Sequence, residues 1–160
     1  MKNKHSKKLS SKFIQGQITF GAIAIGLPIF FLSLIVVIDF GRVLILHNQA
    51  KIYADGAALA AAGAVDIDQF TSSRTTTLDQ GWAQTRAYDH FNWAIENYEN
   101  QDGWMRMRLV NVSIMGNMAY ATVEGRCDSV MSKVFGIDEW RTMVTSSARA
   151  SAGISSDIAP

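Results

Sequence analysis

Residues 20–64 of the chain read FGAIAIGLPIFFLSLIVVIDFGRVLILHNQAKIYADGAALAAAGA, and residues 20–38 of this stretch carry no charged side chain. A helix of about 20 apolar residues crosses the roughly 30 Å hydrocarbon layer of a bilayer. A buried helix of that length in a soluble protein would instead show a polar stripe, and this stretch shows none. The sequence therefore predicts one membrane-spanning helix.

The distribution of charge predicts the orientation of this helix. Five lysines lie within the first twelve residues, and no acidic residue precedes Asp39. The positive-inside bias therefore places residues 1–15 in the cytoplasm and the rest of the chain outside it. A cleavable secretory signal is the alternative, but its apolar core would be roughly 7–15 residues long and a small-residue cleavage site would follow it directly. Residues 20–38 meet neither condition, which favours a retained anchor.

The helical pattern continues beyond the apolar run as far as Ala64. Gly56 and Gly63 are the weak helix formers in this part, and alanine, the best helix former, surrounds them. One helix over residues 20–64 would be about 65 Å long, and about half of it would lie outside the lipid as a stalk. Pro28 removes one backbone hydrogen bond and is expected to kink the membrane half.

Small side chains on the stalk allow another backbone to approach it closely. The close neighbour is either the protein's own sheet or the stalk of a neighbouring copy, and the sequence leaves both alternatives open. The residues concerned are Ala57, Ala58, Ala61 and Ala62.

Residues 65–150 are predicted to form a head that begins with a loop and a second helix. Residues 66–76 are polar and predict the loop. Thr77, with Gln80 three residues later, resembles a capping box that opens a helix ending at residues 100–103. Apolar residues recur along this helix at spacings of three to four and predict one buried face.

The rest of the head is predicted to be a small antiparallel sheet. The alternation of residues 105–114 changes phase near Leu109, which predicts a strand with a bulge. Gly116 and Asn117 supply a turn into a return strand over residues 118–126. One face of the return strand is small and suits close packing onto a helix. That face consists of Ala119, Ala121, Val123 and Gly125.

Two further elements follow this hairpin. Asp128 or Ser129 can cap a short helix that Gly136 would end, and residues 141–150 alternate again as a third strand. The predicted fold class is therefore α+β, with a long N-terminal transmembrane and stalk helix, a second helix, and an antiparallel sheet of about three strands with a short helix. The predicted organisation is a basic leader (1–15), a membrane helix (16–40), a helical stalk (41–64), an extracytoplasmic head (65–150) and a tail (151–160).

The sequence lacks the residue patterns that catalysis or cofactor binding requires. Its three histidines are spread over the leader, the stalk and the second helix, and no nucleophile–base motif or phosphate-binding loop occurs. Asp66 and Asp68 resemble the start of a calcium loop that lacks its glycine and glutamate. We therefore predict no catalytic residue, no metal and no cofactor. Cys127 is the single cysteine and is expected to be a small buried residue.

The net charge of +1 combines a basic leader with a mildly acidic body. From Phe40 onward, ten basic residues stand against thirteen acidic ones, which argues against a nucleic-acid-binding surface. Four large aromatic side chains of the body are expected to lie in the core of the head. These are Trp82, Trp93, Trp104 and Trp140.

Asp39 stands at the outer end of the uncharged run. A carboxylate is costly inside lipid, so we expect Asp39 to mark the membrane boundary. Arg42, three residues on, is close enough along a helix to pair with it. A contact between Asp39 and the stalk of a neighbouring subunit during assembly is the alternative.

The order of several short motifs resembles the N-terminal segment of TadE/TadG-like proteins, pilin-like components of the bacterial tight-adherence (Flp) pilus. The motifs occupy residues 16–20, 27–28, 38–42 and 48–50. They continue into residues 54–62, where Asp55 and the following alanines look like that family's aspartate and alanine run. Residues 134–137 and 148–150 are similar to the end of many short members.

The resemblance implies a single-pass inner-membrane protein with a cytoplasmic N-terminus, a periplasmic head and a pilin-like fold. It implies a minor pilin or an assembly subunit, in the membrane or built into a surface pilus, that supports adhesion and biofilm formation. Its partners would be the lipid bilayer, other pilin-like subunits, the inner-membrane assembly platform and a prepilin peptidase. Subunit packing would use Pro28, Asp39, Arg42, Asp55, Ala57, Ala58, Ala61 and Ala62. The alternative function is a membrane-anchored periplasmic binding module unrelated to pili.

The resemblance also raises the question of cleavage. Pilin-like precursors are cut after a glycine that is followed by a glutamate five residues on. Gly16 and Gln17 form the candidate cleavage site, but Gly21 stands where the glutamate is expected. This departure favours an uncleaved chain.

Overall fold

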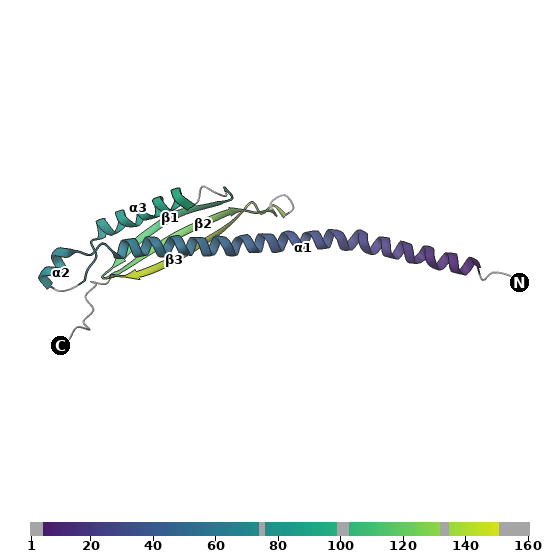
Figure 1. Ribbon diagram of the computed structural model, residues 1–160, viewed down its shortest axis with the longest axis horizontal. Coiled ribbons are helices and arrows are strands. Elements are labelled where there is room, and N and C mark those ends of the chain that lie inside the picture. Colours follow the sequence, from purple (N-terminus) through teal and green to yellow (C-terminus); the bar gives the residue numbers. More distant parts are fainter. Residues whose placement is uncertain (1–4, 74–75, 99–102, 132–134, 151–160) are drawn as a thin grey trace, which may run out of the picture. The chain divides into compact units, whose positions relative to one another are not determined.

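The computed structural model describes residues 5–73, 76–98, 103–131 and 135–150, with the backbone alone described for residues 5–19 and 98. Within these residues it contains three helices followed by three strands (Figure 1), and the predicted α+β fold class is confirmed. The elements are α1 (His5–Ala62), α2 (Ile67–Ser73), α3 (Gln80–Tyr98), β1 (Met105–Met115), β2 (Met118–Asp128) and β3 (Glu139–Arg149).

The chain divides into two compact units, Met1–Phe40 and Gly41–Pro160. In the first unit, the part of α1 that begins at Phe20 is long and apolar enough to cross a membrane, and its large apolar side chains are exposed. Pro28 lies inside this helix. The hydroxyl of Ser33 donates a hydrogen bond to the carbonyl of Ile29 at 2.8 Å. The helix thus satisfies this polar group itself, as an environment without water requires. These features fit the predicted single-pass anchor.

The second unit is built on an antiparallel sheet. Among the described residues the sheet has three strands in the order β1–β2–β3. The register of β1 against β2 shifts between Leu109 and Asn111, so the predicted bulge is present. Gly116 turns the chain between β1 and β2 with a φ of +61°, which glycine adopts without a Cβ clash.

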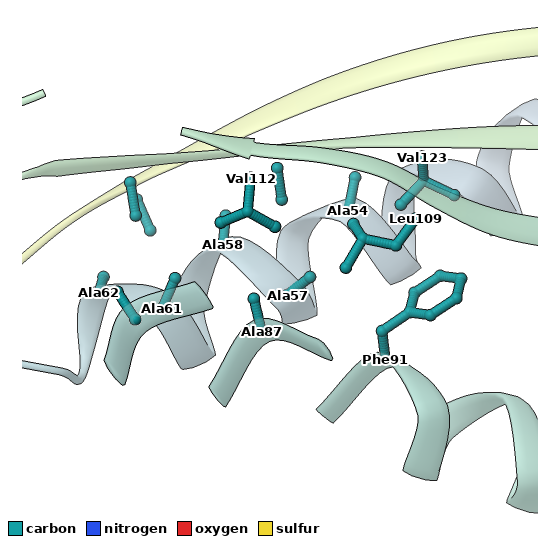
Figure 2. Packing of buried hydrophobic residues seen from close by; sticks show 14 of the residues in the cluster. Ala54, Ala57, Ala58, Ala61, Ala62, Ala87, Phe91, Leu109, Val112 and Val123 are labelled. Carbon is teal, nitrogen blue, oxygen red and sulfur yellow. The ribbon is translucent and has the colours of Figure 1, made fainter. Parts of the chain in front are cut away.

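The core of the second unit lies between one face of this sheet and two helices, the part of α1 from Gly41 onward and α3. Figure 2 shows the alanines of α1 beside Leu109, Val112 and Val123 of the sheet, with Ala87 and Phe91 of α3 completing the cluster. The small face of β2 is buried, as predicted. Most of the side chains that α1 buries here are alanines, with Leu46 and Tyr53 as larger exceptions, and they pack on the larger side chains of the sheet and of α3. The buried alanines of α1 are Ala50, Ala54, Ala57, Ala58, Ala61 and Ala62.

The segment between α1 and α3 differs from the prediction in two ways. Residues 67–73 form the helix α2 instead of a loop, and the carboxylate of Asp66 accepts a hydrogen bond from the backbone N–H of Gln69 at 3.0 Å. The predicted capping role of Thr77 is wrong, because Asp79 accepts the hydrogen bond from the backbone N–H of Trp82 at 2.8 Å and so caps α3.

The start of α3 is set by a backbone pairing with the residues that follow α1, and the spacing of residues in the sequence does not show this pairing. Val65 forms an antiparallel bridge with Leu78, and the backbone N–H of Asp79 donates to the carbonyl of Ala64 at 3.0 Å. Residues 77–79 are therefore held extended, and the helix begins after them.

The connection between β2 and β3 is described in part. The hydroxyl of Ser129 accepts a hydrogen bond from the backbone N–H of Met131 at 3.0 Å, and Gly136 has a φ of +68°. The middle of the predicted short helix, residues 132–134, lies outside the described residues. The third strand is present, and it begins at Glu139 rather than at residue 141.

A single enlarged side chain tests the alanine packing. We expect Ala58→Leu to lower the free energy of unfolding of the head by about 1–3 kcal/mol, because a larger side chain in a filled core forces strained rotamers or backbone shifts. The measurement is chemical denaturation of the full chain in detergent micelles, followed by near-ultraviolet circular dichroism. Ala60→Leu is the matched control, since Ala60 is only half-buried. Equal effects of the two substitutions would contradict this account of the core.

Candidate functional site: an apolar face on α1 and α3

The part of α1 that packs on the sheet leaves an apolar row exposed on its other side. Ile45, Ile52 and Leu59 follow one another at seven-residue intervals, two helical turns apart, and Ile52 and Leu59 are 62% and 67% exposed. Outside lipid, exposed apolar side chains in a contiguous group mark an interaction surface. This row is therefore a candidate site for binding another protein.

Helix α3 extends this surface. Trp82 and Trp93 are 51% and 54% exposed, and Arg86 and His90 lie between them on the same side of α3 at helical spacing. The guanidinium of Arg86 stacks over the ring of Trp82, 4.7 Å from its centroid, and donates a hydrogen bond to the carbonyl of Gly63 at 3.2 Å. We call Ile52, Leu59, Trp82 and Trp93 together the α1–α3 face.

Two glycines bring the helices together beneath the α1–α3 face. A Cβ on Gly56 would lie 2.7 Å from Cε1 of His90, and a Cβ on Gly63 would lie 3.1 Å from Nη1 of Arg86. Both glycines therefore make room for side chains of α3. Gly56 lies in α1, and Gly63 directly follows its last residue. Their seven-residue spacing, two helical turns, is the sequence signal that could have indicated this role.

A cavity of about 490 Å³ opens between α1, α3 and the start of β1. Ile52 and Trp93 line it from the two helices. Tyr53 also lines it and meets the ring of Phe91 edge to face, with 5.9 Å between the ring centroids. A mainly apolar groove of this kind receives the apolar side chains of a partner helix. The remaining lining residues are Gln49, Gly56, His90, Ala94, Gly103, Met105 and Met107.

The other face of the sheet carries a charged cluster. Glu124 accepts two hydrogen bonds from Arg126, both at 3.1 Å, and its carboxylate lies 3.4 Å from Arg108. Hydrogen bonding to Arg126 holds the pKa of Glu124 below its ordinary value, against the opposing effect of burial. Arg106 pairs with Asp128 at 2.9 Å on the same face. The pairing of these charges indicates that the cluster has a structural role in the sheet.

The structure places the predicted packing residues in different environments. The alanines at 57, 58, 61 and 62 lie in the protein's own core, which is one of the two alternatives drawn from the sequence, while Asp55 is exposed. Arg42 stacks over Trp104 at 5.3 Å and donates a hydrogen bond to the carbonyl of Asp128 at 3.4 Å. Asp39 is buried, and its pairing with Arg42 stays a prediction.

Three further expectations have clear outcomes. The expectation that the four tryptophans are core residues is wrong. Trp82 and Trp93 are exposed, because α3 buries Ala83, Ala87, Phe91 and Ala94 instead, and Trp104 and Trp140 are only partly buried and lie outside the core cluster. Cys127 is fully buried, as predicted. Gly16 and Gln17 lie within α1, and cleavage between them stays a prediction.

Comparison with known proteins bears on the N-terminal part of the chain. Residues 16–64 match the Tad family model, described as "Putative Flp pilus-assembly TadE/G-like". This segment is TadE/G-like. The match confirms the resemblance seen in residues 16–64 and relates this segment to Flp pilus assembly. The TadE/G-like segment covers most of α1 and ends two residues beyond it.

The match does not extend into the rest of the head. No curated protein and no solved structure matches the chain. The α1–α3 face thus combines a TadE/G-like helix with a helix, α3, that lies outside the matched segment.

The charged cluster makes a prediction about pH. Because the pKa of Glu124 is lowered in the folded head, its ionised form stabilises the fold above about pH 4.3, the ordinary value for glutamate, and this stability is lost as the pH falls through the lowered value. We expect Glu124→Gln to lower the melting temperature at pH 7 and the difference from the unchanged chain to shrink below pH 4.3. Asp89→Asn, on an exposed carboxylate of α3, is the control. A Glu124→Gln difference that does not depend on pH would contradict the assignment.

Proposed function

We propose that the protein is a minor pilin-like or assembly subunit of a bacterial tight-adherence (Flp) pilus and is not an enzyme. The observation that carries this proposal is the coincidence of the TadE/G-like segment, residues 16–64, with a helix whose first part can span a bilayer. The protein is anchored once in the inner membrane, with its N-terminus in the cytoplasm and its head in the periplasm. It supports adhesion and biofilm formation from the membrane or from the pilus.

The proposed mode of action is packing of helices between subunits. The head holds the alanine face of α1 against its own sheet, so α1 offers its opposite side, with Ile45, Ile52 and Leu59, to a neighbour. The groove beside Ile52 and Trp93 has the size and apolar lining to receive side chains from the neighbour's helix. Pro28, within the apolar run, and Asp39, at its outer end, are further proposed contacts. Asp55, exposed beside Ile52 on α1, supplies a polar group at the edge of the contact.

The proposed partners follow from this role. They are the lipid bilayer, other pilin-like subunits and the inner-membrane assembly platform. A prepilin peptidase joins them if the chain is cut between Gly16 and Gln17. Nucleic acid is not among them, because the body of the chain is mildly acidic.

One observation favours a second candidate function. Trp82 and Trp93 are exposed, and tryptophan is enriched where one protein binds another. A membrane-anchored periplasmic binding module unrelated to pili would use the same α1–α3 face for a soluble partner. The two functions differ in which molecules touch this face.

A photo-crosslinking amino acid at position 52 of the full chain separates the two functions. If the pilus role is right, irradiation of cells links position 52 to a pilin-like subunit or to a platform protein, identified by mass spectrometry. The same amino acid at position 145, exposed on β3, is the matched control and gives no such product. Linkage of position 52 to a soluble periplasmic protein alone would favour the binding module.

A charge in the α1–α3 face tests the same proposal by its effect on assembly. We expect Ile52→Glu to reduce the number of pili per cell at least about tenfold, because burying an unpaired carboxylate costs several kcal/mol and 1.4 kcal/mol is already a factor of ten. Thr145→Glu, on the open face of the sheet, should leave pilus number unchanged. If deletion of the whole protein left pilus number and attachment unchanged, the pilus role would be abandoned.

A further inference from the structure

We propose that the free edge of β3 binds an extended, acidic segment of a partner protein, which pairs with β3 antiparallel as a further strand of the sheet. The described strands lie in the order β1–β2–β3, and α3 lies along β1, so β3 forms the edge away from α3 (Figure 1). This edge is separate from the α1–α3 face. The partner is a different protein from those proposed to cover that face, and the proposal does not rest on a role in pili.

The hydrogen bonds between β2 and β3 show which backbone groups point to the free edge. Just beyond one end of the paired strands, the N–H of Ala150 donates to the carbonyl of Asn117 at 2.8 Å. Just beyond the other end, the N–H of Ser129 donates to the carbonyl of Asp138 at 3.1 Å. In an antiparallel pair, opposite residues that exchange hydrogen bonds alternate with opposite residues that do not. The even-numbered residues of β3 therefore bond to β2, and the odd-numbered ones point their N–H and C=O groups away from it.

These outward backbone groups form an unpaired row. Among the described residues, none of them has a hydrogen-bond partner. The residues that carry them are exposed except for the first, which is half-buried, and Met143 in the middle of the row is 62% exposed. A row of unpaired N–H and C=O groups is a template for another strand. The row consists of Glu139, Arg141, Met143, Thr145, Ser147 and Arg149.

The opposite edge of the sheet, on β1, is interrupted. A bulge shifts the register between Leu109 and Asn111. The carbonyl of Val112 points outward, because Ala121 opposite it bonds to β3, and this carbonyl accepts a hydrogen bond from the side-chain amide of Gln84 at 3.4 Å. Bulges and covering groups of this kind keep an edge from pairing. Over its 11 described residues, β3 has neither a bulge nor a proline, so β3 is the edge that accepts another strand.

The charges along the row select an acidic partner. Arg149 is exposed at the end of β3 and makes no ion pair with a described residue. The single carboxylate of the row, that of Glu139, already pairs with Arg141. The same carboxylate lies 3.8 Å from Arg106 and 3.9 Å from Arg126. Opposite charges directly across two strands stabilise their pairing, and like charges oppose it. A strand with an acidic residue opposite Arg149 therefore fits the edge best.

The same charges disfavour a second copy as the occupant. Its β3 would offer Arg149 only the carboxylate of Glu139, and arginines of its own head already hold that group. A segment of another protein can bring a free acidic side chain. Val144 adds a second requirement, because it is half-buried on the core side of β3, and the residue opposite it lies at the border of the apolar core. The fitting segment thus carries an acidic residue opposite Arg149 and, five residues away, an apolar residue opposite Val144.

Peptide binding to the full chain in detergent micelles tests the strand pairing. The probe is a fluorescein-labelled nine-residue peptide in which threonine and valine alternate between an aspartate at each end. In antiparallel pairing its threonine amides point to β3 and its valine amides point away. We expect fluorescence anisotropy to show at least about tenfold weaker binding when the threonine amides are N-methylated, because the hydrogen bonds to β3 are lost. N-methylation of the valine amides is the matched control and should leave binding unchanged.

A charge exchange tests the preference for an acidic partner. We expect Arg149→Glu to weaken binding of the aspartate peptide by about two- to fivefold, because like charges then face each other across the strands. The same substitution should strengthen binding of a peptide with lysine at each end. Arg149→Lys keeps the charge and should bind as the unchanged chain does. An unchanged near-ultraviolet spectrum shows that each variant head is folded.

Three outcomes would overturn the proposal. The first is no binding of the aspartate peptide, or equal binding of the two N-methylated peptides. The second is an unaltered preference for aspartate over lysine in Arg149→Glu. The third is a dimer of the full chain, seen by sedimentation, that Arg149→Glu disperses, since a second copy would then occupy the edge. Pilus number is not a readout here, so failure of this proposal is distinct from failure of the pilus role.

Discussion

The close contact between the alanines of α1 and the small face of β2 is the constraint on which the head depends. Ala119 and Ala121 are fully buried on β2, and a Cβ on Gly125 would lie 3.0 Å from a methyl carbon of Leu46. Small groups on both sides thus fill the space between this helix and β2. The head has too few apolar residues of its own to close a core in another way. The helix whose first part is long and apolar enough to cross a membrane therefore also supplies, from Gly41 onward, part of the core of the head.

This contact decides which side of α1 is available to other molecules. Once the alanine face is buried, Ile45, Ile52 and Leu59 necessarily face outward. Helix α3 packs beside them because Gly56 and Gly63 leave room for its side chains. The outcome is an apolar surface made by two helices outside the membrane-spanning segment. When another protein covers an apolar surface of this kind, the free energy of the system falls. This decrease would drive the proposed packing between subunits.

The charged side chains on the open face of the sheet form ion pairs with one another. On the open face of the sheet, Arg126 and Arg108 flank Glu124, so a carboxylate with little exposure keeps its charge. Arg106 and Asp128 form the same kind of pair, and Asp128 also contacts Arg42, whose guanidinium lies over Trp104. Pairs of opposite charge keep the guanidinium groups ordered without a large net charge.

Local patterns in the sequence were enough for the long helix, the bulged hairpin near Leu109, the buried Cys127 and the TadE/G-like segment, because each depends on neighbours along the chain. Residues distant in sequence decided the rest. Asp79 caps α3 in place of Thr77 because its backbone pairs with Ala64. Trp82 and Trp93 are exposed because α3 turns Ala83, Ala87, Phe91 and Ala94 toward the core. The α1–α3 face forms where Gly56 contacts His90. The spacing of Gly56 and Gly63 could indicate that a neighbour approaches α1 there, but only the tertiary structure shows that this neighbour is α3, because helical periodicity describes one helix at a time.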